Sequence, residues 1–424
     1  MRAYAQNRLQ EVRQQIEAQD ISRATRRILD LFLDFSLPRN LRHEAVALRA
    51  AYNEYAVKDS QTVEDKEFQT LVQKATNLLA EIEQELLPPI AEPSKEPENT
   101  IPFSANMRAE KDNSDKPIVF LGNALTKTFT SSGHTFCLPP VNIELRAGEI
   151  TGIVGENGNG KTTLLRMIAG DLEADGGKLT YPLFQKEVFD WYDVKNKIGY
   201  IPQHVPKWTG YLKTNLHFTA AIHGIQGEEN EEQVAFTIHR LGLTRYEDAK
   251  WLEISGGYKL RFELARTLVW RPTLLIIDEP LAHLDINAQK IFMQDIRYLA
   301  SSSQHPMAVL ISSQHLHEVE SIADNILFIK NGELLYNGKM SDFGNDRTEN
   351  LYELMTSAER SDLERALKDI EGVKISDVGQ MKTIHTPISV RAAQIMAALA
   401  KADIDIQYFR DISTSTLKLF RDNA

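Results

Sequence analysis

The residues with the clearest chemistry form a glycine-rich turn between a short apolar run, 150–154, and the start of a helix. Glycine lets the backbone curl so that successive N–H groups converge on one anion, and the N-terminus of the following helix adds the positive end of its dipole. This order of strand, turn and helix predicts a phosphate-binding loop. Its residues are Gly155, Glu156, Asn157, Gly158, Asn159, Gly160, Lys161, Thr162 and Thr163.

Two side chains of this loop have a chemistry of their own. We expect Lys161 to reach the β- and γ-phosphates of a nucleotide and the hydroxyl of Thr162 to ligate Mg²⁺. A glycine-rich turn that carries a lysine by chance is the alternative, but the strand and the helix lie on the correct sides. Because kinases, GTPases and ATPases all use such a loop, the rest of the chain has to decide between them.

Further polar stretches accompany the loop at positions where α/β proteins place ligands. An amide follows an apolar strand, a Ser-Gly-Gly sequence opens a helix and offers a second anion-binding terminus, and two acids end a buried strand. A third acid follows shortly after that pair. These residues are Gln203, then Ser255, Gly256 and Gly257, then Asp278 and Glu279, and finally Asp285.

Taken in this order, the pattern resembles the ATP-binding cassette (ABC) ATPases, with residues 155–163 as the Walker A loop. Gln203 matches the Q-loop, Ser255-Gly256-Gly257 the family signature, Asp278-Glu279 the Walker B pair and Asp285 the D-loop. The resemblance covers residues 117–345, about half the chain, and is far more specific than any single motif. It implies an α/β fold, a P-loop ABC-type nucleotide-binding domain with a helical subdomain over about 204–270.

The resemblance also implies ATP and Mg²⁺ as cofactors and gives the polar residues their roles. Asp278 is expected to hold Mg²⁺ through the water shell of the metal, beside the Thr162 hydroxyl, and Gln203 to touch both the metal and the attacking water. Glu279 is placed to polarise that water, with a second magnesium-side carboxylate as the alternative.

Family resemblance also places an aromatic face on adenine, upstream of the phosphate loop. Phe129 fits that spacing. Phe136 is a competitor, and packing in the core is the alternative for both rings.

The chain departs from the family pattern at two positions. Tyr258 replaces the usual glutamine of the signature, and the switch histidine falls on Gln314. An amide can donate to a γ-phosphate but cannot titrate, so we expect slow hydrolysis. His315 is the alternative, although on a strand end it would point to the other side. The cluster of His315, His317, Glu318 and Glu320 predicts a solvated helix start, with a metal site as the alternative.

Composition bounds the class of protein. The chain has 424 residues, of which 42% are hydrophobic and 25% charged, as in globular proteins. A net charge of −11 argues against general nucleic-acid binding. The single cysteine, Cys137, fits a reducing compartment. We see neither a signal peptide nor an apolar run of about 20 residues, so we expect a cytoplasmic protein.

The remaining chain predicts two flanking domains and a linker. Apolar residues at helical spacing predict an all-α bundle over residues 1–87, closed on itself rather than forming a coiled coil. Proline-rich, charged residues 88–116 predict a linker on which this bundle would move. Residues 346–424 predict a small α/β accessory domain, with Ser389 capping a helix and a strand over 404–408.

One cassette in the chain implies a partner. In the family arrangement two cassettes face each other, and Ser255-Gly256-Gly257 of one caps the γ-phosphate held by the other. We therefore expect a second ABC subunit, in a homodimer with two equivalent sites.

The resemblance favours an ATPase subunit that drives a separate membrane permease of the exporter type, peripheral at the inner face of the cell membrane. Region 204–254 would then carry the coupling surface. The alternative is a soluble ABC switch in regulation or defence, in which residues 1–87 bind an adaptor partner.

Overall fold

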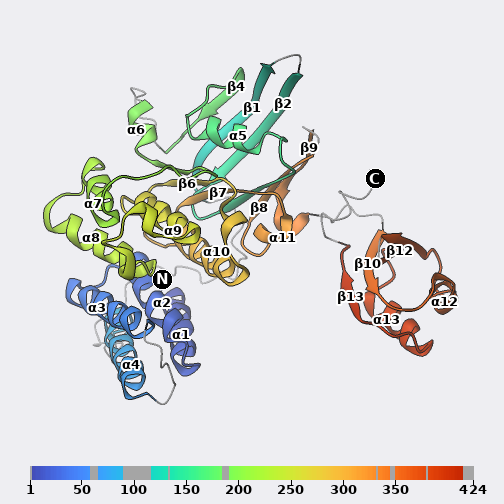
Figure 1. The fold of residues 1–424 in the computed structure, drawn as a ribbon, viewed down its shortest axis with the longest axis horizontal. Coiled ribbons are helices and arrows are strands. Elements are labelled where there is room, and N and C mark those ends of the chain that lie inside the picture. The colour runs from blue at the N-terminus through green and yellow to red at the C-terminus, as the bar shows by residue number, and fades with distance from the viewer. Residues whose placement is uncertain are drawn as a thin grey trace, which may run out of the picture.

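The computed structural model describes most of the chain, and Figure 1 shows how its elements are arranged. A bundle of helices comes first, a cassette of mixed sheets and helices follows, and a small α/β unit ends the chain. The described residues are 2–57, 65–88, 116–131, 134–183, 191–330, 333–343, 349–378 and 381–413. Most of the predicted linker, residues 88–116, lies outside these ranges.

The N-terminal bundle consists of α1 (Arg2–Glu17), α2 (Ile21–Asp34), α3 (Arg39–Tyr55) and α4 (Lys66–Leu86). Aspartates cap two of these helices: Asp20 accepts from the backbone N–H of Arg23, and Asp65 from that of Glu67. The apolar stripes face one another in a shared core. Helices therefore form where the apolar spacing predicts them.

The bundle does not hang free from the cassette. Asp30 of α2 accepts from Nε of Arg240 at 2.7 Å, and Asp295 accepts from Arg26 at 3.0 Å and Arg27 at 3.3 Å. Arg240 belongs to α8 (Gly227–Arg240) and Asp295 to α10 (Ile286–Ala300), both in the cassette. All five side chains are buried, and buried charges depend on their partners. The expectation of a bundle that moves on its linker is therefore wrong.

Neutral contacts surround this charged centre. Phe236 of α8 packs into the apolar core of the bundle. Ser302, after α10, donates to the carbonyl of Leu33 at 2.8 Å, and Asn53 of α3 donates to Thr244 at 3.1 Å. The bundle thus contacts both the helical subdomain and the end of α10, as Figure 1 shows.

The cassette is built on a six-stranded sheet that is parallel except for its last strand. Its central strands are fully buried apolar runs, as expected for a sheet covered on both faces. Parallel pairing brings Ile201, Ile277 and Ser313 to one edge of the sheet beside Val154. The order is β5 (Ile198–Ile201), β6 (Leu274–Ile277), β7 (Ala308–Ser313), β3 (Ile150–Val154), β8 (Asn325–Lys330) and β9 (Glu333–Lys339).

A second, antiparallel sheet packs beside the first and shares an apolar core with it and with the helix after the phosphate loop. Its strands lie in the order β2 (His134–Arg146), β1 (Ile118–Ser131) and β4 (Gly176–Thr180).

Some helices of the cassette pack around the main sheet, and α7, α8 and α9 form the helical subdomain (Figure 1). Besides α8 and α10, the helices are α5 (Lys161–Ile168), α6 (Trp191–Lys195), α7 (Leu212–Ile222), α9 (Gly256–Leu268) and α11 (Leu316–Val319). Short 3-10 turns are η2 (Thr244–Tyr246), η3 (Trp251–Glu253), η4 (Pro280–His283) and η5 (Met340–Asp342).

The C-terminal unit has the β-α-β-β-α-β order of a split β-α-β fold. Its antiparallel sheet has the strand order β11-β12-β10-β13, and two helices share one core with it. The elements are β10 (Glu349–Met355), α12 (Arg360–Ala366), β11 (Lys374–Val378), β12 (Met381–Pro387), α13 (Ala392–Lys401) and β13 (Tyr408–Asp411).

Two local predictions in this unit are wrong. Ser389 does not cap α13, because the helix begins later: its N-cap is Arg391, whose N–H donates to the side chain of Gln394 at 2.8 Å. The strand predicted over 404–408 begins only at Tyr408, because the N–H of Ile404 closes the end of α13 on Leu399. The strand β10 has no counterpart among the predicted elements.

Among the described residues, no helix combines the length and the apolar character that crossing a membrane requires.

Candidate nucleotide-binding site

The phosphate loop joins β3 to α5, and its glycines are needed for its shape. Gly155 lies so close to the neighbouring strand that a Cβ there would come within 2.3 Å of the carbonyl oxygen of Ile329. Gly160 has a φ of +90°, and a Cβ would meet the ring of Phe136 at 2.8 Å. Any side chain at either position would push the loop away from β8 or from Phe136.

Residues 156–159 form the outer turn of the loop. Glu156, Asn157 and Gly158 are exposed, while Asn159 is buried. Thr163 is half-buried in the first turn of α5. The loop therefore presents its backbone and the N-terminus of α5 at the edge where the parallel strands end.

Lys161 is buried at the centre of the loop and makes three contacts. Its ammonium group donates to the carbonyls of Gly155 at 2.7 Å and Glu156 at 3.1 Å, and forms an ion pair with Glu279 at 3.0 Å. The lysine thus bridges the loop and the carboxyl end of β6.

Asp278 follows β6, and its carboxylate accepts hydrogen bonds from two hydroxyl groups. Thr162 Oγ1 donates to one carboxylate oxygen at 2.8 Å, and Ser312 Oγ donates to the other at 2.6 Å. The parallel register of β6 with β7, and of β7 with β3, brings these three side chains together. Hydroxyl and carboxylate oxygens are the ligands that Mg²⁺ prefers in proteins.

Glu279 is the residue on which the polar groups converge. Beside Lys161, Nε2 of Gln203 and Nε2 of Gln314 each donate to its Oε2 at 2.8 Å. Its own backbone has a φ of 45° and a ψ of 53°, a left-handed conformation that costs a non-glycine residue about 1–3 kcal/mol. The fold maintains this strain at the position where the sequence predicts the water-polarising carboxylate.

The structure places Gln314, and not its neighbour, against this carboxylate. His315 is instead the N-cap residue of α11, and its ring stacks on that of His317 with 5.5 Å between centroids. Glu318 accepts a hydrogen bond from Ser313. Among the described residues, no group of three or more His, Cys, Asp or Glu side chains is arranged to hold a metal ion, which leaves the solvated helix start.

Ser312 is a site residue that motif reasoning did not identify. Besides donating to Asp278, its hydroxyl accepts the backbone N–H of Glu279 at 2.8 Å, and it is fully buried. It therefore orients both members of the acidic pair. The available signal was a pair of hydroxyl residues at the end of an otherwise apolar strand, 308–313.

The signature residues lie apart from these groups. Ser255 is the N-cap residue of α9, and Gly256 and Gly257 are its first helical residues. No hydrogen bond found among the described residues joins them to the phosphate loop. Tyr258 packs on Tyr246 with 4.2 Å between ring centroids, so this departure from the family pattern serves packing inside the helical subdomain. Asp285 precedes α10 and accepts from the N–H of Ala288 at 2.9 Å.

Both candidate aromatic rings lie near the loop. Phe136 is partly buried against Gly160, whereas Phe129 is 42% exposed and lies 6.3 Å from Phe136, centroid to centroid. The ammonium group of Lys127 lies 5.7 Å from the ring of Phe129. Phe129 is therefore the more exposed of the two rings, while Phe136 packs against the loop.

Comparisons with known proteins agree with this geometry. The family model described as ABC transporter matches residues 138–282. The ABC transporter ATP-binding protein NatA of Bacillus subtilis is 31% identical over 217 residues, which cover 50% of this chain and 85% of NatA. The uncharacterized ABC transporter ATP-binding protein YdbJ of the same organism is 34% identical over 219 residues, covering 51% and 68%.

Among solved structures, that of cbiO1 from Clostridium perfringens, described as part of the ABC transporter complex cbiONQ, covers 54% of this chain and 91% of its own. The TM-score is 0.47 and the sequence identity 22%. The two Bacillus relatives are matched over most of their length at 30% identity or more. On their strength, this chain belongs to the ATP-binding proteins of ABC transporters, a family of P-loop ATPases.

Proposed function

We propose that this chain binds and hydrolyses Mg·ATP, dimerises on ATP and drives a separate membrane permease, in the direction of export. The observation that carries the catalytic part is the convergence of Lys161, Gln203 and Gln314 on the carboxylate of Glu279. The direction of export rests on resemblance alone, since exporter subunits accommodate an accessory domain after the cassette.

The residues at the edge of the sheet fit the cofactors. Thr162 and Asp278, already 2.8 Å apart, would hold Mg²⁺ with Gln203 beside them, and the backbone N–H groups of the loop would receive the phosphates. When bound, Mg²⁺ neutralises charge on the phosphate oxygens. Phe129 would offer its exposed ring to adenine.

In this proposal Lys161 exchanges partners. A nucleotide phosphate competes with Glu279 for the ammonium group of Lys161. Once the lysine has moved to the phosphate, the carboxylate of Glu279 is free to accept a proton from the attacking water. Gln203 and Gln314 hold Glu279 through its other oxygen and so fix its orientation. Because Gln314 is an amide, it can position groups but cannot carry a proton, and we expect slow turnover.

The second subunit is required because the signature residues of one chain lie apart from its own phosphate loop. Ser255, Gly256 and Gly257 open a 13-residue helix whose N-terminus suits an anion. In a head-to-tail homodimer each chain would present this terminus to the nucleotide held by its partner.

The permease would contact the exposed face of α7. Phe218 and Ile222 are four residues apart, so they lie on the same side of the helix, and they are 66% and 55% exposed. In the part of the chain that the structure describes, the N-terminal bundle packs mainly on α8 and η2. Large exposed apolar side chains of this kind mark protein contacts.

Purification of the intact chain from membranes tests the proposal. A permease should co-purify with the wild-type chain and with Met396→Glu, an exposed position on α13 that serves as the control. Phe218→Glu should lose the permease and keep its ATP affinity. Recovery of the same permease with Phe218→Glu would exclude α7 as the contact.

A soluble ABC switch in regulation or defence is the second candidate function. The observation that favours it is the docking of the N-terminal bundle on both α8 and α10, through which an adaptor bound to the bundle would reach the nucleotide site. A dimer that forms on ATP but recovers no membrane protein from any fraction would favour this candidate.

A further inference from the structure

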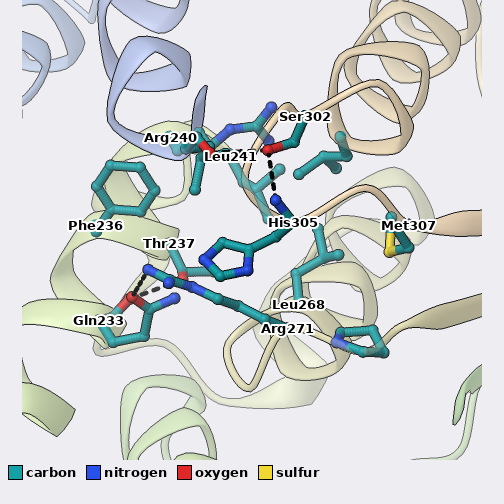
Figure 2. A pocket seen from close by; sticks show the side chains of 13 residues that line it. Gln233, Phe236, Thr237, Arg240, Leu241, Leu268, Arg271, Ser302, His305 and Met307 are labelled. Carbon is teal, nitrogen blue, oxygen red and sulfur yellow. Dashed lines mark hydrogen bonds between the residues drawn. The ribbon is translucent and has the colours of Figure 1, made fainter. Parts of the chain in front are cut away.

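A pocket of about 60 Å³ lies where the N-terminal bundle meets the cassette, and none of its lining residues belongs to the nucleotide site (Figure 2). Leu33 of α2 forms the wall on the side of the bundle. Phe236 of α8 comes from the helical subdomain, and His305 and Met307 follow α10. The pocket is thus enclosed by three parts of the chain that are distant in sequence.

The inner wall is mostly apolar, although it includes the buried charge of Arg240, whose Nε donates to Asp30. Four leucines, from α2, α9, α10 and the residue after α8, line it together with the methionine that precedes β7, namely Leu33, Leu268, Leu299, Leu241 and Met307. The nearby hydroxyls are already used, because Thr237 donates to the carbonyl of Gln233 and Ser302 to that of Leu33. This wall suits a short hydrocarbon chain.

The rim is positively charged. Arg271 is exposed there, and its Nη2 donates to Oε1 of Gln233 at 3.0 Å, while Arg42 of the bundle donates to the same oxygen at 3.0 Å. Among the described residues, neither arginine forms a salt bridge with a carboxylate. Two cations that share one neutral oxygen leave donors for an anion.

Electrostatics agree with this geometry. Although the Arg271 side chain reaches solvent, partial burial of its guanidinium group lowers its pKa, against the through-space effect of Glu229. Burial and the positive charge of Arg271 lower the pKa of Arg42, whereas the negative charges of Glu232 and Glu229 raise it. Burial is the first cause of both shifts, so both guanidinium groups lie partly out of water at the rim.

His305 adds a second hydrogen-bonding group to the rim. Figure 2 shows its ring beside the side chain of Arg271, which extends toward Gln233. Among the described residues, neither ring nitrogen has a hydrogen-bond partner. Partial burial and the charge of Arg271 lower the pKa of His305 and favour the neutral ring, which can donate one hydrogen bond.

We propose that this pocket binds a small amphipathic carboxylate. Its hydrocarbon chain packs on Leu241, Leu268 and Met307, and its carboxylate pairs with Arg271 and accepts from His305. Because Leu33 forms part of the wall, the bound ligand holds the bundle against the cassette. The inference is independent of the proposed transport function.

The size of the pocket sets the probe. At about 10–15 Å³ per water-sized group, the pocket holds about four to six such groups, the size of butyrate. Sodium butyrate is titrated calorimetrically into the full chain without nucleotide. n-Butylamine and n-butanol, of the same chain length, serve as cationic and neutral comparisons.

Saturable one-to-one binding of butyrate, about tenfold or more tighter than that of either comparison, is the expected result. Because a ligand stabilises the state it binds, butyrate should also slow hydrogen exchange in α2. Equal affinity for all three compounds, or no saturable binding of butyrate, would overturn the proposal and leave a pocket that holds water.

Two variants locate the binding. Arg271→Gln should weaken butyrate about tenfold or more, since a charge-assisted hydrogen bond is lost, whereas Arg365→Gln on exposed α12 should leave it unchanged. Leu268→Phe should fill the pocket and abolish binding. The ATP affinity of each variant, measured in parallel, shows that it is folded. Butyrate binding that survives both Arg271→Gln and Leu268→Phe would place the ligand elsewhere.

Discussion

At the scale of single residues, the candidate site is held together by one carboxylate. Glu279 is 8% exposed, adopts a strained backbone conformation and takes part in one ion pair and two amide hydrogen bonds. Its neighbour Asp278 is occupied by two hydroxyls. The two carboxylates therefore have separate partners, although Ser312 also accepts the backbone N–H of Glu279, and this agrees with separate proposed roles in metal binding and in water activation.

Lys161→Ala removes the ammonium group that would contact the phosphates. Loss of a charge-assisted hydrogen bond costs about 1.5–3 kcal/mol, so ATP affinity should fall at least about tenfold, and high-affinity binding should disappear. Fluorescent ATP titration measures this. Lys178→Ala is the matched control, since it removes an exposed lysine of β4 that belongs to none of the motifs. Affinity near that of the wild type in Lys161→Ala would remove the lysine from its proposed role.

Glu279→Gln keeps the shape of the side chain and removes its ability to accept a proton. Loss of a general base typically lowers kcat by about 10²–10⁴-fold. ATP binding should remain, so the variant should accumulate as an ATP-bound dimer, visible by size-exclusion chromatography with light scattering. Normal turnover in this variant would exclude Glu279 as the principal water-positioning group.

Gln314→His restores a titratable ring at the position that contacts Glu279. We expect ATP affinity to stay the same and turnover to rise, measured by phosphate release. His315→Ala is the control, since that ring stacks on His317 and not on the site. Unchanged turnover in Gln314→His together with an inactive His315→Ala would move the switch position by one residue.

At the scale of elements, sequence periodicity predicts what is determined locally. The apolar runs that became β3, β5, β6 and β8 and the helical stripes of α2, α3 and α4 are visible in the sequence because each repeats with its own structural period. The contacts of Asp278 could be anticipated in part, since parallel strands end at one edge. The partner hydroxyl of Ser312 could not, because strand order is not a local property.

The docking of the N-terminal bundle on the cassette could not be predicted from the sequence for the same reason. The sequence of α2 gives no sign that its charged residues Arg26, Arg27 and Asp30 are buried. Their partners, Arg240 and Asp295, are more than 200 residues away in the sequence. A proline-rich linker lets the two domains that it joins move independently only when those domains do not bind each other. Buried charge pairs on α2, α8 and α10 supply that binding here.

Asp295→Ala tests this docking at the level of α10. It leaves the buried guanidinium group of Arg26 without a carboxylate and leaves Arg27 with Asp30 alone, and breaking a buried pair typically costs about 3–5 kcal/mol. Thermal unfolding and hydrogen exchange in α2 should both show the loss. Glu364→Ala breaks an exposed pair with Arg360 on α12 and should leave the thermal unfolding of the chain almost unchanged. Equal effects of the two substitutions would mean that Asp295 does not hold the bundle.

At the scale of the whole molecule, the position of the signature residues, apart from the phosphate loop of their own chain, predicts a nucleotide site completed by a second chain. A site completed in trans allows two inactive chains to rescue each other. When Lys161→Ala and Ser255→Arg chains are mixed, the mixed dimer combines the intact phosphate loop of one with the intact signature of the other. Random pairing makes half of the dimers mixed, each with one of two sites intact, so about a quarter of the wild-type ATPase rate should return.

The matched control mixes Lys161→Ala with Glu279→Gln. Both substitutions damage the same half of each site, so no mixed dimer contains an intact one and no activity should return. If Ser255 acted on the nucleotide in its own chain, neither mixture would recover activity, because each chain would carry its own defect. Rescue in the first mixture and its absence in the second therefore separate a composite, two-chain site from a single-chain one, using phosphate release alone.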